Sequence, residues 1–310
     1  MKLTLVALLA VVALPLHAAD ASSGADCRPT VTGKLDIFDL QSSTFGNSRK
    51  LRVWLPPGYS DSTNERRYYP VLYIFDAQNV FDICTSYAHK EWQVDETLTR
   101  LIGKGKVEPL IVVGIDHAGE RRAYEWLPWQ DNIQNPGGGP TGGVRLTEFM
   151  VKDVMPAAEA RYRIRKGPEN TAIAGSSYGG VAALYVGIMA PTVFGKVLGE
   201  SPVLWVGNGQ LVRDTVGIPM APSRTYLGYG MKEWKLPGEN ETSAKMLSQL
   251  AANLRSATFK PGEVRVEIDP DATHDEDAWA RRFPEAIQFL FPRNAVPAPP
   301  SVETKHSRGN

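Results

Sequence analysis

A serine, a histidine and an acidic residue occur here in an order and setting that suit nucleophilic catalysis. Gly175-Ser176-Ser177-Tyr178-Gly179 matches the pattern Gly-x-Ser-x-Gly, in which a serine occupies a sharp turn between a strand and a helix. The small strand-like run 171–174 precedes this match, and residues 180–184 follow it as a helix start. Glycines flank the serine because the strained turn leaves no room for neighbouring side chains. By its spacing, Ser177 rather than Ser176 is the candidate nucleophile.

A serine hydroxyl becomes a good nucleophile when a base takes its proton, and in this topology a histidine should follow the serine in the chain. His89 and His117 precede Ser177, and His306 lies in a polar C-terminal tail. His274 follows the last predicted strand and precedes an amphipathic helix. The sequence therefore predicts that His274 is the base.

The third residue should accept a hydrogen bond from the imidazole and should follow a strand between the serine and the histidine. Glu233 fits this position best, because it follows the strand-like run 225–228. Asp269 and Asp271 are nearer to His274 in the sequence, and either could serve if the loop folded back.

The developing oxyanion of an acyl transfer needs backbone N–H donors. The residue after the nucleophile, Tyr178, is predicted to supply one of them. The loop after the early strand 71–75 is predicted to supply the second, from either Ala77 or Gln78. Asp76 is expected to be a structural carboxylate that holds this loop in place.

These residues require a scaffold in which strands alternate with helices. Short β-rich runs are predicted as strands at 51–55, 71–75, 110–115, 171–174, 197–200, 225–228 and 264–268. Apolar residues recur at helical spacing at Leu247, Leu250, Ala251 and Leu254, and again from Trp279 to Leu290. A further helical stretch is predicted at 146–162. This alternation predicts a single α/β domain over residues 36–291.

Composition excludes several other classes of protein. The 310 residues carry 34 Lys and Arg against 34 Asp and Glu, so no basic field exists for nucleic acid. With 43% hydrophobic residues, the chain can bury a core. No Gly-rich turn has the spacing of a phosphate-binding or dinucleotide site, and the predicted chemistry needs neither a cofactor nor a metal. The sequence leaves the oligomeric state open.

The N-terminal region has the pattern of a secretory leader. Lys2 precedes an apolar run at 3–16 and then small residues, which predicts a signal peptide at 1–21 and a periplasmic or secreted protein without stable membrane insertion. Residues 22–35 are predicted to form an N-terminal segment, and 292–310 a Pro-rich disordered tail. An oxidising compartment allows Cys27 and Cys84 to pair, although the sequence does not decide whether they do.

Taken together, these segments resemble the putative-esterase family of α/β-hydrolases, which includes esterase D-like enzymes, siderophore (enterochelin) esterases and feruloyl esterases. The resemblance runs from about Phe38 to Phe291. Its landmarks are Leu55-Pro56-Pro57-Gly58-Tyr59, Asp76-Ala77-Gln78-Asn79-Val80-Phe81-Asp82, Glu120-Arg121-Arg122, Glu125-Trp126-Leu127-Pro128-Trp129, the Ser177 motif, Ser201-Pro202, and His274-Asp275-Glu276 with Trp279.

The resemblance implies an α/β-hydrolase fold, with a mostly parallel central sheet and helices on both faces. It also implies hydrolysis of small-molecule carboxylic esters, with Ser177 as nucleophile, His274 as base and Glu233 as acid. Two positions depart from the family pattern. Ala77 stands where such proteins often have Gly, and Asp275 where they often have Asn.

Candidate substrate contacts lie in segments that follow strands or the serine turn. Trp129 and Trp205 could form walls for an aromatic acyl group, as could Trp126 and Trp234. Arg122 could meet an anionic ligand, but an ion pair of Arg121 or Arg122 with Glu120 or Glu125 on the surface is the favoured use. The predicted function is an exported serine esterase acting on siderophore, aromatic acyl or short-chain esters. The alternatives are an acyltransferase of the same fold and a non-catalytic binding protein on this scaffold.

Overall fold

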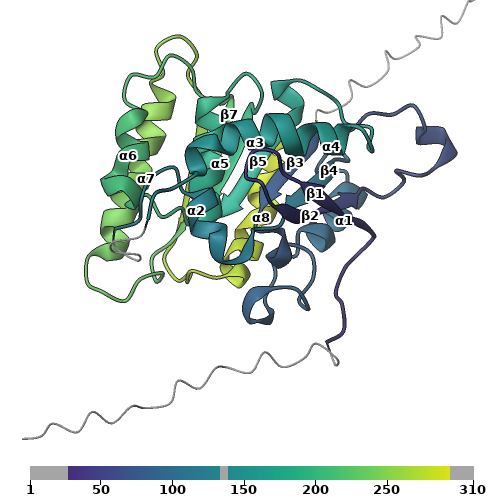
Figure 1. The fold of residues 1–310 in the computed structure, drawn as a ribbon, viewed down its shortest axis with the longest axis horizontal. Coiled ribbons are helices and arrows are strands. Elements are labelled where there is room, and N and C mark those ends of the chain that lie inside the picture. The colour runs from purple at the N-terminus through teal and green to yellow at the C-terminus, as the bar shows by residue number, and fades with distance from the viewer. Residues whose placement is uncertain (1–26, 133–138, 294–310) are drawn as a thin grey trace, which may run out of the picture.

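The computed structural model describes residues 27–132 and 139–293 of the chain. The predicted leader at 1–21 lies outside these residues, as does nearly all of the predicted tail. One sheet of eight strands forms the centre of the molecule, in the order β1-β2-β4-β3-β5-β6-β7-β8 (Figure 1). The strands are β1 (Lys34–Gln41), β2 (Ser48–Leu55), β3 (Val71–Phe75), β4 (Ile111–Ile115), β5 (Thr171–Ser176), β6 (Lys196–Glu200), β7 (Arg224–Gly230) and β8 (Glu263–Asp269).

The pairing within the sheet is mostly parallel. β1 pairs antiparallel with β2, and β2 pairs antiparallel with β4. All pairings from β4 through β3 to β8 are parallel. The central strands are buried along their whole length, as expected of a parallel sheet covered on both faces. The α/β-hydrolase prediction is therefore confirmed, and every strand predicted from the sequence is present.

Helices cover both faces of the sheet (Figure 1). They are α1 (Val94–Gly103), α2 (Arg122–Trp126), α3 (Leu146–Phe149), α4 (Met155–Glu159), α5 (Ser177–Met189), α6 (Val206–Asp214), α7 (Glu239–Arg255) and α8 (Glu276–Leu290). A π-helical turn at Met150–Val154 joins α3 to α4. Side chains of α1 and α8 form one buried cluster with the sheet, and those of α3, α5 and α7 form another.

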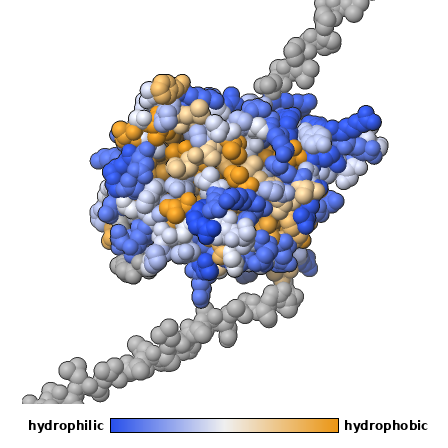
Figure 2. Space-filling model, turned by 45° about the horizontal axis from the view of Figure 1, so that its top comes forward, coloured by the Kyte–Doolittle hydropathy of each residue, from blue (hydrophilic) through white to orange (hydrophobic). Residues whose placement is uncertain are grey.

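The two clusters follow from the period of the strands. Successive side chains of a strand point to opposite faces, so Val71, Tyr73 and Phe75 join the cluster of α5, whereas Leu72 and Ile74 join that of α8. On the face shown in Figure 2, hydrophobic residues form separate groups among hydrophilic ones. Within the described ranges, no helix combines the length and apolar character that crossing a bilayer requires.

Candidate active site

The candidate nucleophile, acid and base each follow the carboxyl end of a parallel strand. Ser177 comes directly after β5, Glu233 follows β7, and His274 follows β8. Asp76 and His117 follow β3 and β4 in the same way. Because parallel strands end at one edge of the sheet, these side chains gather where ligands bind in open α/β folds. Ser177 and His274 line one cavity of about 490 Å³ at this edge.

Ser177 has the backbone geometry of a strained turn between a strand and a helix. Its φ is 56°, a left-handed value that residues other than glycine seldom adopt. A Cβ on Gly175 would lie 2.2 Å from the carbonyl oxygen of Gly179, and a Cβ on Gly179 would lie 2.6 Å from Asp76 Oδ2. Glycine at both positions is therefore what allows the turn to form. The structure thus places Ser177 at the first position of α5, as the motif predicts.

His274 and Glu233 are joined directly. His274 Nδ1 lies 2.8 Å from Glu233 Oε2, and the carboxylate is fully buried while the imidazole is 18% exposed. Glu233 Oε1 accepts hydrogen bonds from Gly230 N–H at 2.7 Å and from Ser201 Oγ. Because both carboxylate oxygens are engaged, Glu233 holds the imidazole through Nδ1. The other ring nitrogen, Nε2, is then available to exchange a proton with a nearby group. Asp271, an alternative acid, instead pairs with Lys232 at 2.6 Å.

A buried polar network supports Glu233 from behind. Ser201 Oγ, which donates to Glu233, accepts hydrogen bonds from Trp279 Nε1 at 2.9 Å and from Arg282 Nη2 at 3.3 Å. Arg282 also pairs with Glu200, at 2.8 Å from Nε and 2.7 Å from Nη2 to the same carboxylate oxygen. Burial raises the pKa of Glu200 to about 7, and Arg282 offsets part of that rise.

Replacing Arg282 by methionine should lower the free energy of unfolding by about 3–5 kcal/mol at pH 8, because the substitution leaves the buried Glu200 carboxylate without its cation. The loss should depend on pH. The folded-state pKa of Glu200 lies above its ordinary value of 4.5, so the stability from this group is present below about pH 4.5 and is lost as pH rises towards 7. Without Arg282 the pKa of Glu200 rises further, so the free energy of unfolding of the variant should continue to fall at higher pH.

Urea unfolding of Arg282→Met at pH 5 and pH 8 measures both effects. The adjacent Arg281 is exposed, so Arg281→Met is the matched control and should change stability by less than about 0.5 kcal/mol. Adding Glu200→Gln to Arg282→Met should recover part of the loss at pH 8. An Arg282→Met loss that is equal at the two pH values would contradict the assignment of the buried charge.

Asp76 is a structural carboxylate, as predicted. It accepts two hydrogen bonds from Arg122 and one from Trp126 Nε1, all at 2.8 Å. Burial alone would raise the pKa of Asp76, but the Arg122 guanidinium outweighs burial and keeps the pKa below its ordinary value. The expected surface pairing of Arg122 with Glu120 or Glu125 is therefore wrong. Glu125 is fully buried and bonds to Arg49 at 2.6 Å and to Arg121 at 3.1 Å.

The prediction failed for Arg122 because its partner is distant in the sequence. Asp76 precedes Arg122 by 46 positions and meets it across the edge of the sheet. Arg122 also lies over the Tyr178 ring, with 5.2 Å from its guanidinium carbon to the ring centroid, and lines the cavity of Ser177. It therefore remains a candidate substrate contact even though its charge is paired.

The turn predicted to hold the oxyanion follows β3 as a 3-10 turn, Ala77–Asn79. The hydrogen bonds of this turn begin with Asn79 N–H, so the N–H groups of Ala77 and Gln78 lie at its open end. The Gln78 side chain donates to His117 O at 3.3 Å and accepts from His117 N–H at 3.2 Å, which ties the β3 turn to the β4 loop. Tyr178 N–H belongs to the first turn of α5.

The candidate aromatic walls lie elsewhere. Trp205 packs edge-on against Trp234 at a centroid distance of 4.9 Å, and both line a separate pocket of about 450 Å³. Trp129 packs edge-on against Tyr185 at 5.6 Å. Neither Trp129 nor Trp205 is among the residues that line the Ser177 cavity, so their contact with substrate stays a prediction. Trp234 and Trp279 instead flank the imidazole of His274, at centroid distances of 4.8 and 5.4 Å.

Several cavity residues were missed by the sequence analysis. His117 could have been found, because it follows a strand at the same edge of the sheet. Its Nδ1 accepts a hydrogen bond from Gly119 N–H at 3.0 Å, and burial lowers its pKa. Within residues 27–132 and 139–293, no group of His, Cys, Asp and Glu is placed to hold a metal ion. The sequence analysis did not single out three other lining residues, Tyr87, Ala88 and Lys90. It named four more only as family landmarks, without a role in the site: Asn79, Asp275, Glu276 and Trp279.

Comparison with known proteins decides the family. The model of the family described as "Putative esterase" matches residues 42–290, which is most of the chain. The chain belongs to this family. This esterase is therefore a carboxylic ester hydrolase, and the resemblance drawn from its motifs is confirmed.

Individual relatives are distant. The esterase is 22% identical over 261 residues to the uncharacterized protein YbbA of Bacillus subtilis. This match covers 82% of the present chain and 97% of YbbA. The esterase is 28% identical over 195 residues to the iron(III) enterobactin esterase of Dickeya dadantii, covering 60% of this chain and 37% of that enzyme. The chain thus spans about a third of the enterobactin esterase. Among solved structures, an IroE-like serine hydrolase from Shewanella oneidensis has a TM-score of 0.64 at 19% identity, covering 83% of this chain and 80% of that one.

Proposed function

We propose that this esterase hydrolyses esters through an acyl-enzyme on Ser177, with His274 as the proton carrier and Glu233 as its orienting carboxylate. The observation that carries the proposal is the 2.8 Å contact between His274 Nδ1 and Glu233 Oε2. This contact fixes the tautomer in which Nδ1 carries the proton, so the other ring nitrogen is free to accept one. Ser177 and His274 line the same cavity.

The reaction follows from these positions. Ser177 Oγ attacks the ester carbonyl carbon and gives its proton to His274, and the carbonyl oxygen becomes an oxyanion. The N–H of Tyr178 and that of Ala77 or Gln78 hold this oxyanion. When the intermediate collapses, the leaving alcohol takes the proton from His274. Water then attacks the acyl-enzyme with His274 as base, and releases the acid and Ser177.

The substrate proposal is an ester of small or medium size whose acyl group is aromatic or short. The enterobactin esterase relative supports a siderophore ester as substrate. The aromatic side chains around His274 support an aromatic acyl group, such as a feruloyl group. Both signs of charge line the cavity, since Arg122 and Lys90 face it together with Asp76, Asp275 and Glu276. Because positive and negative side chains line the cavity together, we expect no strong preference for anionic over neutral esters.

Fluorophosphonate labelling tests the nucleophile directly. One adduct per chain should form on the wild-type protein, peptide mass spectrometry should locate it on Ser177, and prior incubation with an ester substrate should slow it. Turnover on short acyl, aromatic acyl and siderophore esters, with and without added alcohol acceptors, then separates hydrolysis from acyl transfer. No adduct together with no turnover on the panel would refute the proposal, and an acceptor-dependent product with little free acid would indicate an acyltransferase.

We also propose that the protein is exported. The leader-like pattern at residues 1–21 supports this, although it lies outside the described residues. The Cys27–Cys84 disulfide adds support, because such bonds persist mainly in oxidising compartments. Mass spectrometry of protein recovered from cell fractions should find the chain beginning near residue 22 in the periplasm or the medium. Recovery of the full-length chain from the cytoplasm alone would contradict export.

A further inference from the structure

One wall of the Ser177 cavity is formed by the irregular segment Asp82–Lys90, which we call the rim segment. Tyr87, Ala88 and Lys90 of this segment line the cavity. Tyr87 is 80% exposed, so its ring covers little of the protein's own core. Ala88 and His89 both have left-handed φ values, 55° and 52°, which cost free energy and therefore need support from neighbouring contacts.

The rim segment connects two parts of the candidate machinery. On one side, Tyr87 N–H donates to Asn79 Oδ1 at 3.0 Å, and Thr85 Oγ1 donates to Gln78 O at 2.7 Å, so the segment contacts the proposed oxyanion turn. On the other side, Lys90 Nζ lies 3.1 Å from Asp275 Oδ2 and 2.5 Å from Asp277 Oδ2, next to His274. The segment therefore spans the cavity mouth between the oxyanion turn and the histidine loop.

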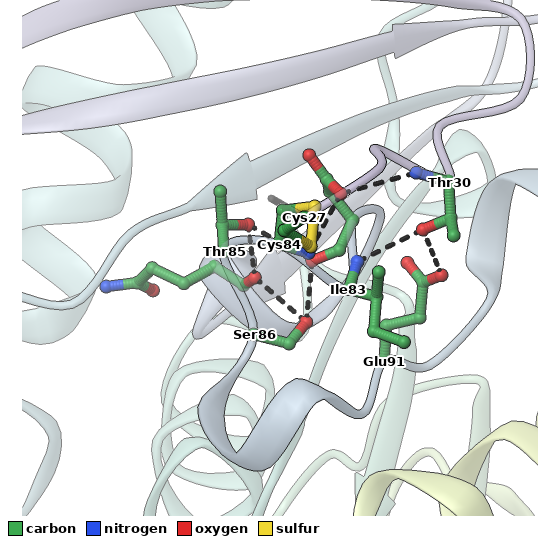
Figure 3. The surroundings of a disulfide bond; sticks show 9 residues. Cys27, Thr30, Ile83, Cys84, Thr85, Ser86 and Glu91 are labelled. Carbon is green, nitrogen blue, oxygen red and sulfur yellow. Dashed lines mark hydrogen bonds between the residues drawn. A yellow bond between two sulfur atoms is a disulfide. The ribbon is translucent and has the colours of Figure 1, made fainter. Parts of the chain in front are cut away.

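A covalent bond fixes this segment to the N-terminal part of the chain. Cys27 and Cys84 form a disulfide with a Cα–Cα distance of 5.6 Å, which answers the question that the sequence left open (Figure 3). Thr30 reinforces the bond, since its Oγ1 accepts from Ile83 N–H at 3.0 Å and donates to Glu91 at 2.5 Å. Between them, these links hold a segment that has no regular secondary structure over most of its length.

We propose that the rim segment is the specificity-determining wall of this esterase, that Tyr87 contacts the bulky end of the substrate, and that the Cys27–Cys84 disulfide positions this wall. The proposal rests on the proposed function of Ser177. A large apolar or aromatic group that reaches the cavity mouth would cover the exposed Tyr87 ring, whereas a short ester would not reach it. A tethered wall is already ordered before binding, so less conformational freedom is lost when a bulky ester binds.

The test compares three carboxylic esters that differ in whether, and on which side of the ester bond, they carry a bulky group. One is a short ester such as methyl butanoate. The second carries a naphthyl group on the alcohol side, and the third carries it on the acyl side. Tyr87→Ala should raise KM about tenfold for at least one naphthyl ester, with kcat nearly unchanged and a much smaller change for the short ester. Tyr87→Phe should restore the wild-type KM, because the ring is what contacts the substrate.

The disulfide is tested by replacing both cysteines with serine and assaying well below the unfolding temperature. The double variant should raise KM for the same naphthyl ester that Tyr87→Ala affects. Arg281→Met is the control, because Arg281 is exposed, lies outside the rim segment and is not among the cavity-lining residues, so KM for all three esters should stay at the wild-type value. If the double variant does not fold, Tyr87→Ala and Lys90→Met test the wall with the disulfide intact.

The outcomes separate clearly. An equal fall of kcat/KM for all three esters would overturn the specificity role, since a merely structural role lowers the fraction of active enzyme for every substrate alike. Unchanged kinetics for all three esters would overturn it too. Failure of the underlying function has a different signature, because the wild-type protein would then neither hydrolyse any of the three esters nor take up fluorophosphonate.

Discussion

Ser177→Ala should lower kcat for ester hydrolysis by a factor on the order of 10⁴ to 10⁶, because it removes the atom that forms the acyl-enzyme. Stability should change little. Alanine and serine carry a similar penalty at the left-handed φ of 56°, so the substitution leaves the strain of the turn in place. Steady-state hydrolysis of an aryl ester and the urea midpoint of unfolding measure the two quantities.

Ser176→Ala is the matched control, since it makes the same chemical change one residue earlier. Ser176 is the last residue of β5 and has extended backbone, with φ −123° and ψ 158°. Ser176 also lines the cavity, but it precedes the sharp turn that Ser177 occupies, so the variant should retain kcat within about tenfold of wild type. A collapse of activity in Ser176→Ala with normal activity in Ser177→Ala would show that the nucleophile has been misassigned.

The fold was predictable where hydrophobic pattern and burial agree. Six of the seven predicted strands lie in the buried part of the sheet, where continuous apolar runs reflect cover on both faces, whereas the run 264–268 belongs to the partly exposed edge strand β8. The strand β1 was missed because it is an edge strand and much of it is exposed, which weakens its pattern. Helix α1 was also missed, although Val94, Leu98 and Leu101 recur at helical spacing and are buried. That spacing was a usable signal.

The site was predictable as far as chain order and strand ends determine it. The serine motif, the histidine after the last strand and the acid after β7 follow from topology, and the structure joins Glu233 to His274. Contacts between loops of different strands carry no local signal. The pairing of Asp76 with Arg122 and that of Lys90 with Asp275 each join residues far apart in the sequence, and side-chain type alone allows many other partners.

Glu233→Gln should lower kcat by a factor on the order of 10⁴, through the tautomer of His274. In the wild type, one carboxylate oxygen accepts from Gly230 N–H and Ser201 Oγ, while the other receives His274 Nδ1. Glutamine has a single oxygen. If that oxygen keeps the bonds to Gly230 and Ser201, the amide NH₂ faces Nδ1 and moves the histidine proton to the other ring nitrogen. The imidazole can then no longer accept the proton of Ser177.

The alternative acids provide controls for the same chemical change. Asp269→Asn and Asp271→Asn should keep kcat within about threefold of wild type, because Asp271 pairs with Lys232 on the surface and Asp269 Oδ1 accepts from Asp271 N–H. NMR of the imidazole nitrogens at neutral pH should find the proton on Nδ1 in wild type and on Nε2 in Glu233→Gln. A large kcat loss in Glu233→Gln without a change of tautomer would mean that the carboxylate acts by its charge alone.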